Sequence, residues 1–273
     1  MKKKFLKLSL LLFSGLLSGG VGIYAYGCAD GWWGFAETSS FTPEAFADSS
    51  YAPMFYEPYE KFYNYAELDY ISKYNDDIVA DWDQYLQGKL DSTQLRYFLL
   101  SDSSSEESAT IYAALQGKGV DRKKITKKYK AKELRNFFTF LHYAKAVEEF
   151  STSVFYSWDY AERTKASADQ DFVESLEKTY AKVPTKDMFF KNRMWFQVMK
   201  AKFYSDNQPA LIDFFEQTAD SQPKNTVYMR AVGYLAGTYY NLKEFDKSNF
   251  YFATLFNDYP QLRHQALYNF RPM

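Results

Sequence analysis

The chain has 273 residues, 47% of them hydrophobic and 25% charged, so it is long enough for one large domain or two smaller ones. Its 33 basic and 34 acidic side chains nearly cancel, which excludes a nucleic-acid-binding protein driven by overall charge. Two histidines and one cysteine exclude a zinc finger, a disulfide scaffold and most polyhistidine metal centres. The unusual feature is a 20% content of aromatic residues.

Residues 1–27 have the pattern of a secretory signal peptide. A basic start at Lys2 to Lys4 precedes a leucine-rich run that ends at Leu17, and Ala25-Tyr26-Gly27 provides a small-x-small cleavage pattern. An uncleaved membrane anchor is the alternative, although glycines thin the second half of the run. We therefore expect an exported bacterial protein that resides in the periplasm, at the outer membrane or on the cell surface.

Cys28, the only cysteine, directly follows this signal. In bacterial lipoproteins the cysteine after the cleavage site is acylated, and two or more acyl chains hold the protein on the membrane. Gly27 fits that pattern, whereas Tyr26 and Ala25 fit it poorly. Cys28 is therefore a lipidation candidate, and we expect membrane attachment only through such an anchor. The alternative is a soluble exported protein with one free thiol.

Residues 28–65 predict an extended, aromatic-rich strap. Pro43, Pro53 and Pro58 discourage a regular helix, yet nine aromatic side chains between residues 41 and 65 supply too much apolar area to remain in water. We expect this strap to lie along the helices that follow it. Trp32 and Trp33, near its start, could instead form an aromatic platform that binds a glycan or a peptide.

Short helices are expected between residues 75 and 117. Asn75 can cap a helix that closes at Gly88, Asp91 starts a second one, and residues 106–116 form a third. The aspartates in the first of these helices lack the glycine-centred loop of a calcium site, so we expect no metal and no cofactor.

Charge divides the exported chain into two segments. Residues 28–117 carry sixteen acidic and four basic side chains, whereas residues 118–273 carry eighteen acidic and twenty-five basic ones. Nine of these basic residues lie between Lys118 and Arg135. These residues could bind anionic lipid or nucleic acid. Export and the lack of a recognised nucleic-acid-binding motif argue against nucleic acid. The two segments either dock on one another or present one of them to a charged partner.

From Glu133 onward, apolar residues recur at helical spacing in three pairs of helices, each followed by a proline. These prolines, Pro184, Pro223 and Pro260, lie 39 and 37 residues apart, a period typical of stacked helical hairpins. Residues 263–270 predict one more helix. We expect it to pack back on the preceding helices, to meet another chain or to belong to a longer repeat protein.

The third pair, residues 227–256, resembles a tetratricopeptide repeat. The residues at that family's expected intervals are Val232, Leu235, Ala236, Tyr239, Phe245, Ser248, Phe252 and Pro260. Leu255 is larger than the usual residue, and Val232 replaces a preferred tryptophan. The second pair is more divergent: Trp195, Phe215 and Pro223 fit, but Met199 and Leu211 are too large for small positions. The resemblance implies a mainly α fold in which residues 118–273 form a solenoid of stacked antiparallel hairpins.

The same resemblance implies a concave surface that binds extended protein segments. We therefore expect a binding scaffold that engages a protein partner in the cell envelope, with a cell-surface glycan-binding protein as the alternative. Exposed, coplanar Tyr and Trp side chains would favour the glycan. We expect no enzymatic activity, because His142 and His264 lack ligand-spaced partners and neither a nucleophile elbow nor a phosphate loop is present. An enzyme would need carboxylates or a histidine that converge in one pocket.

Overall fold

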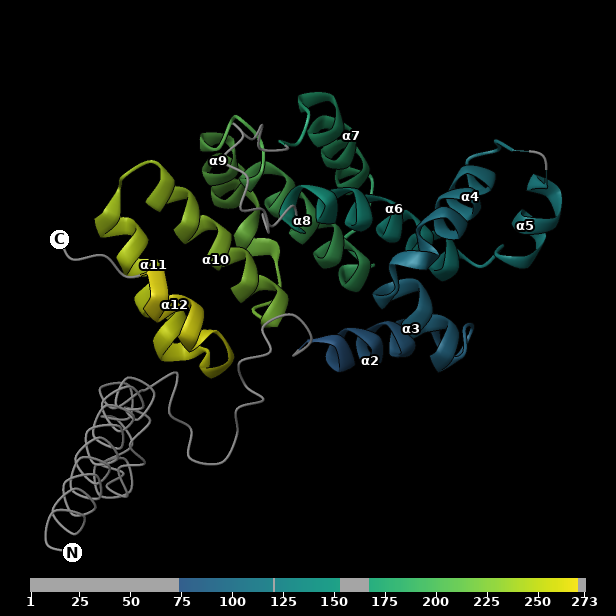
Figure 1. Ribbon diagram of the computed structural model, residues 1–273, viewed down its shortest axis with the longest axis horizontal. Coiled ribbons are helices and arrows are strands. Elements are labelled where there is room, and N and C mark those ends of the chain that lie inside the picture. Colours follow the sequence, from purple (N-terminus) through teal and green to yellow (C-terminus); the bar gives the residue numbers. More distant parts are fainter. Residues whose placement is uncertain (1–73, 120, 153–166, 270–273) are drawn as a thin grey trace, which may run out of the picture. The chain divides into compact units, whose positions relative to one another are not determined.

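The computed structural model describes residues 74–119, 121–152 and 167–269, all of which belong to one compact unit, Asp69–Met273 (Figure 1). Within these ranges the regular structure is entirely helical, without a β-strand, so the expected mainly α fold is confirmed. The signal peptide, Cys28, Trp32, Trp33 and the strap at residues 28–65 lie outside the described residues.

Eleven α-helices occur in the described ranges and carry the labels of Figure 1. They are α2 (Asn75–Leu86), α3 (Ser92–Leu100), α4 (Ser105–Leu115), α5 (Arg122–Lys128), α6 (Lys132–Thr152), α7 (Gln170–Ala181), α8 (Met188–Phe203), α9 (Pro209–Thr218), α10 (Thr226–Asn241), α11 (Phe245–Asp258) and α12 (Arg263–Asn269). Single 3-10 turns precede α4 and α12 and follow α9.

The helix starts show where local sequence signals succeed and where they fail. Asp91 caps α3 as expected: its carboxylate accepts a hydrogen bond from the backbone N–H of Gln94 at 2.8 Å, and the Gln94 side chain reaches back to complete a capping box. The expectation for Asn75 is wrong. Asn75 is the first residue of α2, and Tyr74 takes the cap position without a side-chain hydrogen bond. The helix that was expected from residue 106 begins one residue earlier, at Ser105.

Helix α8 is the centre of the described unit. It contacts α6, α7, α9 and α10, and nearly every side chain from Phe190 to Lys202 is buried. The burial includes the polar side chains of Asn192, Arg193, Gln197 and Lys202, so it follows from the position of α8 among four other helices and not from an entirely apolar sequence. Its buried Trp195 stacks on Tyr228 of α10 at 5.6 Å and donates a hydrogen bond from Nε1 to Thr218 Oγ1 at 2.7 Å.

The helices of the acidic segment pack on the later helices mainly through aromatic rings. The fully buried Trp82 of α2 lies 5.0 Å from the rings of both Phe137 and Phe189. Charge contributes less: within the described ranges, two ion pairs join the segments, Lys89–Glu133 and Arg193–Asp81. Of these pairs, Arg193–Asp81 alone joins an acid of the first segment to a base of the second.

Helices α10 and α11 bury the residues that carry the repeat resemblance. Leu235, Ala236, Ser248 and Phe252 are all at most 2% exposed. The small side chains at 236 and 248 leave room for two helices to approach closely. Leu255, which is larger than the usual residue, is also buried.

The remaining helix, α12, packs on α11, which is one of the outcomes that the sequence left open. Its Ala266 is fully buried.

Candidate functional site

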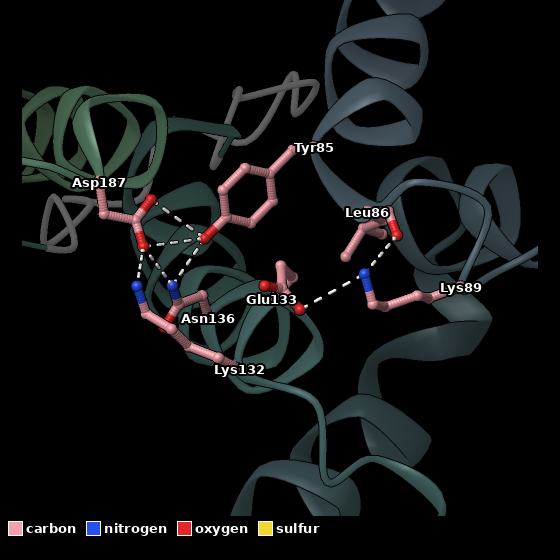
Figure 2. Close-up of polar contacts among 7 residues, drawn as sticks. All are labelled: Tyr85, Leu86, Lys89, Lys132, Glu133, Asn136 and Asp187. Carbon is pink, nitrogen blue, oxygen red and sulfur yellow. Dashed lines mark hydrogen bonds and ion pairs between the residues drawn. The ribbon is translucent and has the colours of Figure 1, made fainter.

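A polar cluster of four residues ties α2 and α6 to the start of α8 (Figure 2). We call Tyr85, Lys132, Asn136 and Asp187 the Asp187 cluster. The Asp187 side chain is only 8% exposed, and its carboxylate accepts hydrogen bonds from the Tyr85 hydroxyl at 3.1 Å, Asn136 Nδ2 at 3.0 Å and Lys132 Nζ at 2.7 Å. Asn136 Nδ2 also donates to the Tyr85 oxygen at 2.7 Å. Every member therefore has a partner within the cluster.

The electrostatics of this cluster suit a structural role. Burial raises the pKa of Tyr85, and the nearby Asp187 charge raises it further, while the hydrogen bond from Asn136 opposes the shift. The phenol therefore stays protonated and remains a donor to the carboxylate. A buried carboxylate with three donors is satisfied without a ligand. We interpret the Asp187 cluster as a structural cluster that holds three helices together.

The more promising site lies on the adjoining faces of α8 and α10. We call the set Arg193, Phe196, Lys200, Arg230 and Tyr234 the α8–α10 face. The three α8 residues are spaced by three and four positions, which places them on one side of the helix. The guanidinium carbon of Arg230 lies 4.9 Å from the centre of the Phe196 ring, and the Phe196 and Tyr234 rings lie 5.9 Å apart. The face therefore combines three cations with aromatic rings.

The three cations differ in how their charges are balanced. The buried Arg193 forms an ion pair with Asp81 of α2 and donates a hydrogen bond to Asn192 Oδ1 at 3.1 Å. Lys200 and Arg230 are half-buried, and no carboxylate of the described ranges forms an ion pair with either of them. Among the residues that the structure describes, two positive charges are thus partly removed from water without an ion-pair partner, an arrangement that costs free energy.

The titration of Lys200 reflects this imbalance. Burial, together with the neighbouring Arg230 charge, lowers the pKa of its ammonium to about 8, against a smaller opposing effect of Glu148. A group with an opposite charge at close range would show the reverse shift. The guanidinium of Arg230 instead makes cation–π contacts with two rings, those of Phe196 and of Tyr74 at 4.7 Å.

Two phenols add neutral hydrogen-bond donors to the same region. Tyr204 follows Lys200 by one helical turn, Tyr234 follows Arg230 by one turn, and the rings of the two tyrosines lie 6.2 Å apart. Burial raises the pKa of both phenols, so both keep their protons at neutral pH. Cations and hydroxyl donors on adjacent helices form a suitable environment for an anionic group.

A separate cavity of about 400 Å³ lies between α4 and α6. His142, Lys145 and the carboxylates of Asp102, Glu148 and Glu149 are among its lining residues. The structure thus brings a histidine and carboxylates round one cavity, the arrangement that an enzyme would require.

The ionisable side chains round this cavity are not joined to one another by hydrogen bonds within the described ranges. The His142 ring stacks on Tyr112 at 4.0 Å, and burial lowers its pKa, so it stays neutral. Asp102, Glu148 and Glu149 are exposed, and within the described part of the chain no hydrogen bond links them to His142. A general base needs such contact with its partner. Nor do three metal-ligating side chains converge anywhere in those ranges.

Comparisons of the chain with protein family models, with curated proteins and with solved structures find no match. Among the helices that are described, none is both long and apolar enough to cross a membrane. The fold and the site are therefore interpreted from the sequence and the structure of this chain.

Sequence reasoning did not single out Lys200 or Arg230. A signal was present for Arg230, which lies inside a largely apolar helical stretch where a solvated charge is not expected. Lys200 lies among other polar residues of α8, such as Gln197 and Lys202, so nothing local distinguishes it. The residues that the sequence did propose, Cys28, Trp32 and Trp33, are outside the described ranges, so they stay predictions.

Proposed function

We propose that residues 118–273 form a tetratricopeptide-like solenoid of stacked antiparallel hairpins, preceded by the strap and the short helices of residues 28–117. Contacts within the α8–α9 and α10–α11 pairs, and between α8 and α10, support this arrangement. The buried small residues Ala236 and Ser248, at the family's expected positions, support it as well.

On this fold, the protein serves as an exported binding scaffold that engages a protein partner in the cell envelope through the α8–α10 face. The observation that carries the proposal is the pair of half-buried cations, Lys200 and Arg230, which lack a counter-ion in the described ranges. Folding alone does not favour such a pair, and departures from the rules of stable folding concentrate at functional sites.

The location of the protein is part of the same proposal. Residues 1–27 direct export, to the periplasm, the outer membrane or the cell surface. Membrane attachment, if present, occurs through acyl chains on Cys28 rather than through a spanning helix. We propose binding without catalysis, cofactor or nucleic acid.

The glycan-binding alternative depends on Trp32 and Trp33. Within the described ranges, the strongly exposed tyrosine and phenylalanine rings are Tyr97 of α3 and Phe250 of α11, at 36% and 66% exposure. They belong to different helices and do not form a coplanar pair. No observation on the described residues favours a glycan over a protein.

A cross-linking pull-down from intact cell-envelope fractions tests the function. The tagged full-length chain is cross-linked in cells and purified, and its mature N-terminus and captured proteins are identified by mass spectrometry. We expect cleavage after Gly27 and one protein captured reproducibly and stoichiometrically. Binding of oligosaccharide by the purified protein, with no captured protein, would contradict the scaffold role.

A further inference from the structure

We infer that the α8–α10 face binds an acidic segment of the partner protein, with a carboxylate held by Lys200 and Arg230 together. This inference rests on the proposed function and names the chemistry of its ligand.

The charges on the face determine the sign of the ligand. Asp81 neutralises Arg193, whereas Lys200 and Arg230 have no ion-pair partner among the residues that the structure describes. A carboxylate between these two groups would form charge-assisted hydrogen bonds and relieve the repulsion that each exerts on the other. The guanidinium of Arg230 contacts the rings of Tyr74 and Phe196, and no residue of the described ranges accepts a hydrogen bond from it, so its N–H donors can take part in this contact.

The surroundings of the two cations favour a protein segment over other anions. An anionic membrane surface attracts clusters of four to eight basic residues, and nucleic acid binding requires many phosphate contacts. The α8–α10 face offers two cations without an ion-pair partner in the described ranges. Arg230 lies over the Phe196 ring, and Tyr234 lies between the rings of Phe196 and Tyr204, at 5.9 and 6.2 Å. Aromatic side chains together with arginine are typical of the buried centre of protein–protein interfaces.

The basic run at residues 118–135 is a competing location for an acidic ligand, and it supplies a matched control. Lys123 and Lys124 of α5 are exposed, and no ion pair involves either of them within the described ranges. Lys123→Gln/Lys124→Gln therefore removes the same two charges as Lys200→Gln/Arg230→Gln, and both variants have the same net charge.

Binding is measured by fluorescence anisotropy with the full mature chain. The probe is a labelled twelve-residue peptide in which glutamate alternates with alanine, and the reference peptide has glutamine in place of glutamate. We expect the wild-type chain to prefer the glutamate peptide at least tenfold. Lys200→Gln/Arg230→Gln should weaken that binding at least tenfold, and Lys123→Gln/Lys124→Gln by less than twofold. Circular dichroism and thermal melting establish that both variants are folded.

The inference would be wrong if all three chains bound the glutamate peptide with equal affinity, or if none of them bound it measurably. It would also be wrong if the wild-type chain bound the glutamate and glutamine peptides equally well. Displacement of the glutamate peptide by millimolar inorganic phosphate would indicate a small-anion site and would likewise overturn it.

The envelope pull-down separates this failure from failure of the scaffold role. If Lys200→Gln/Arg230→Gln captures the same protein as the wild type, the scaffold stands and the α8–α10 face is not its site. If the variant loses that protein and the α5 control retains it, the inference is supported.

Discussion

The charged side chains near the two ends of α8 differ in whether they have partners of opposite charge. Asp187, just before the helix, is a buried carboxylate with three internal donors, whereas Lys200, near the end of the helix, is a half-buried cation without an ion-pair partner in the described ranges. The first arrangement is what stable folding requires of a buried charge. The second arrangement is unfavourable for folding, and a partner's carboxylate would explain it. The following substitutions test whether this difference between the two ends is real.

The largest effect is expected from Asp187→Ala. The substitution leaves the Tyr85 hydroxyl and Asn136 Nδ2 without their shared acceptor in a buried position. We expect the free energy of unfolding, measured by urea denaturation, to fall by about 2–4 kcal/mol. Asp206→Ala, which removes an exposed carboxylate, is the control and should change it by less than about 0.5 kcal/mol. A loss below about 1 kcal/mol for Asp187→Ala would contradict the structural role of the Asp187 cluster.

Tyr85→Phe measures how much of the stability provided by the Asp187 cluster comes from the Tyr85 hydroxyl. The ring stays stacked on Phe189 at 4.6 Å, but the hydroxyl that bridges Asn136 and Asp187 is lost. We expect the free energy of unfolding to fall by about 1.5 kcal/mol, because Asp187 keeps two of its three donors. A double-mutant cycle with Asp187→Ala should show strong coupling, and independent effects would mean that the hydroxyl does not act through Asp187.

At the opposite end of α8, Lys200→Met should stabilise the isolated protein. Methionine keeps an unbranched side chain of similar length and removes the half-buried charge that Arg230 repels. We expect the free energy of unfolding at pH 7 to rise by about 1 kcal/mol, and the affinity for the glutamate peptide to fall. Lys124→Met on α5 should leave both quantities unchanged. Destabilisation by Lys200→Met would indicate that Lys200 has a favourable structural role.

The pH dependence of stability provides the finest test. The folded-state pKa of Lys200, about 8, lies below its ordinary value of 10.5, so above pH 8 the unfolded chain binds more protons than the folded chain. The penalty from this group is therefore complete below pH 8 and decreases as the pH rises toward 10. Arg230 on α10 lowers this pKa and Glu148 on α6 raises it.

Urea denaturation of both chains between pH 7 and 9.5 measures this effect, because the contribution of tyrosine ionisation is the same in both chains and cancels in their difference. We expect the stability advantage of Lys200→Met over the wild type to shrink steadily across that range. An advantage that stays constant with pH would show that the charge of Lys200 is not its cause.

The helices were largely predictable from the sequence because their signals are local. Apolar spacing placed the outer ends of the α10–α11 pair within two residues of where they lie, and Asp91 marked the start of α3. The Asn75 cap failed because α2 begins one residue earlier, at the position where a cap was expected.

The polar sites were not predictable, because they depend on tertiary contacts. Tyr85 and Asp187 are 102 residues apart in the sequence, and nothing local indicates that they meet. The missing counter-ions of Lys200 and Arg230 were equally hidden, because a carboxylate from any helix could have paired with them. An unbalanced charge can be recognised only when all of its neighbours are known.

The most direct test of the account is whether an acidic peptide stabilises the fold through these two cations. Urea denaturation of the mature chain is measured with and without the glutamate peptide at a hundredfold excess over its wild-type Kd. We expect the peptide to raise the free energy of unfolding of the wild type by about 2.7 kcal/mol, and that of Lys200→Gln/Arg230→Gln by about 1.4 kcal/mol or less. The same increase in both chains would contradict the account.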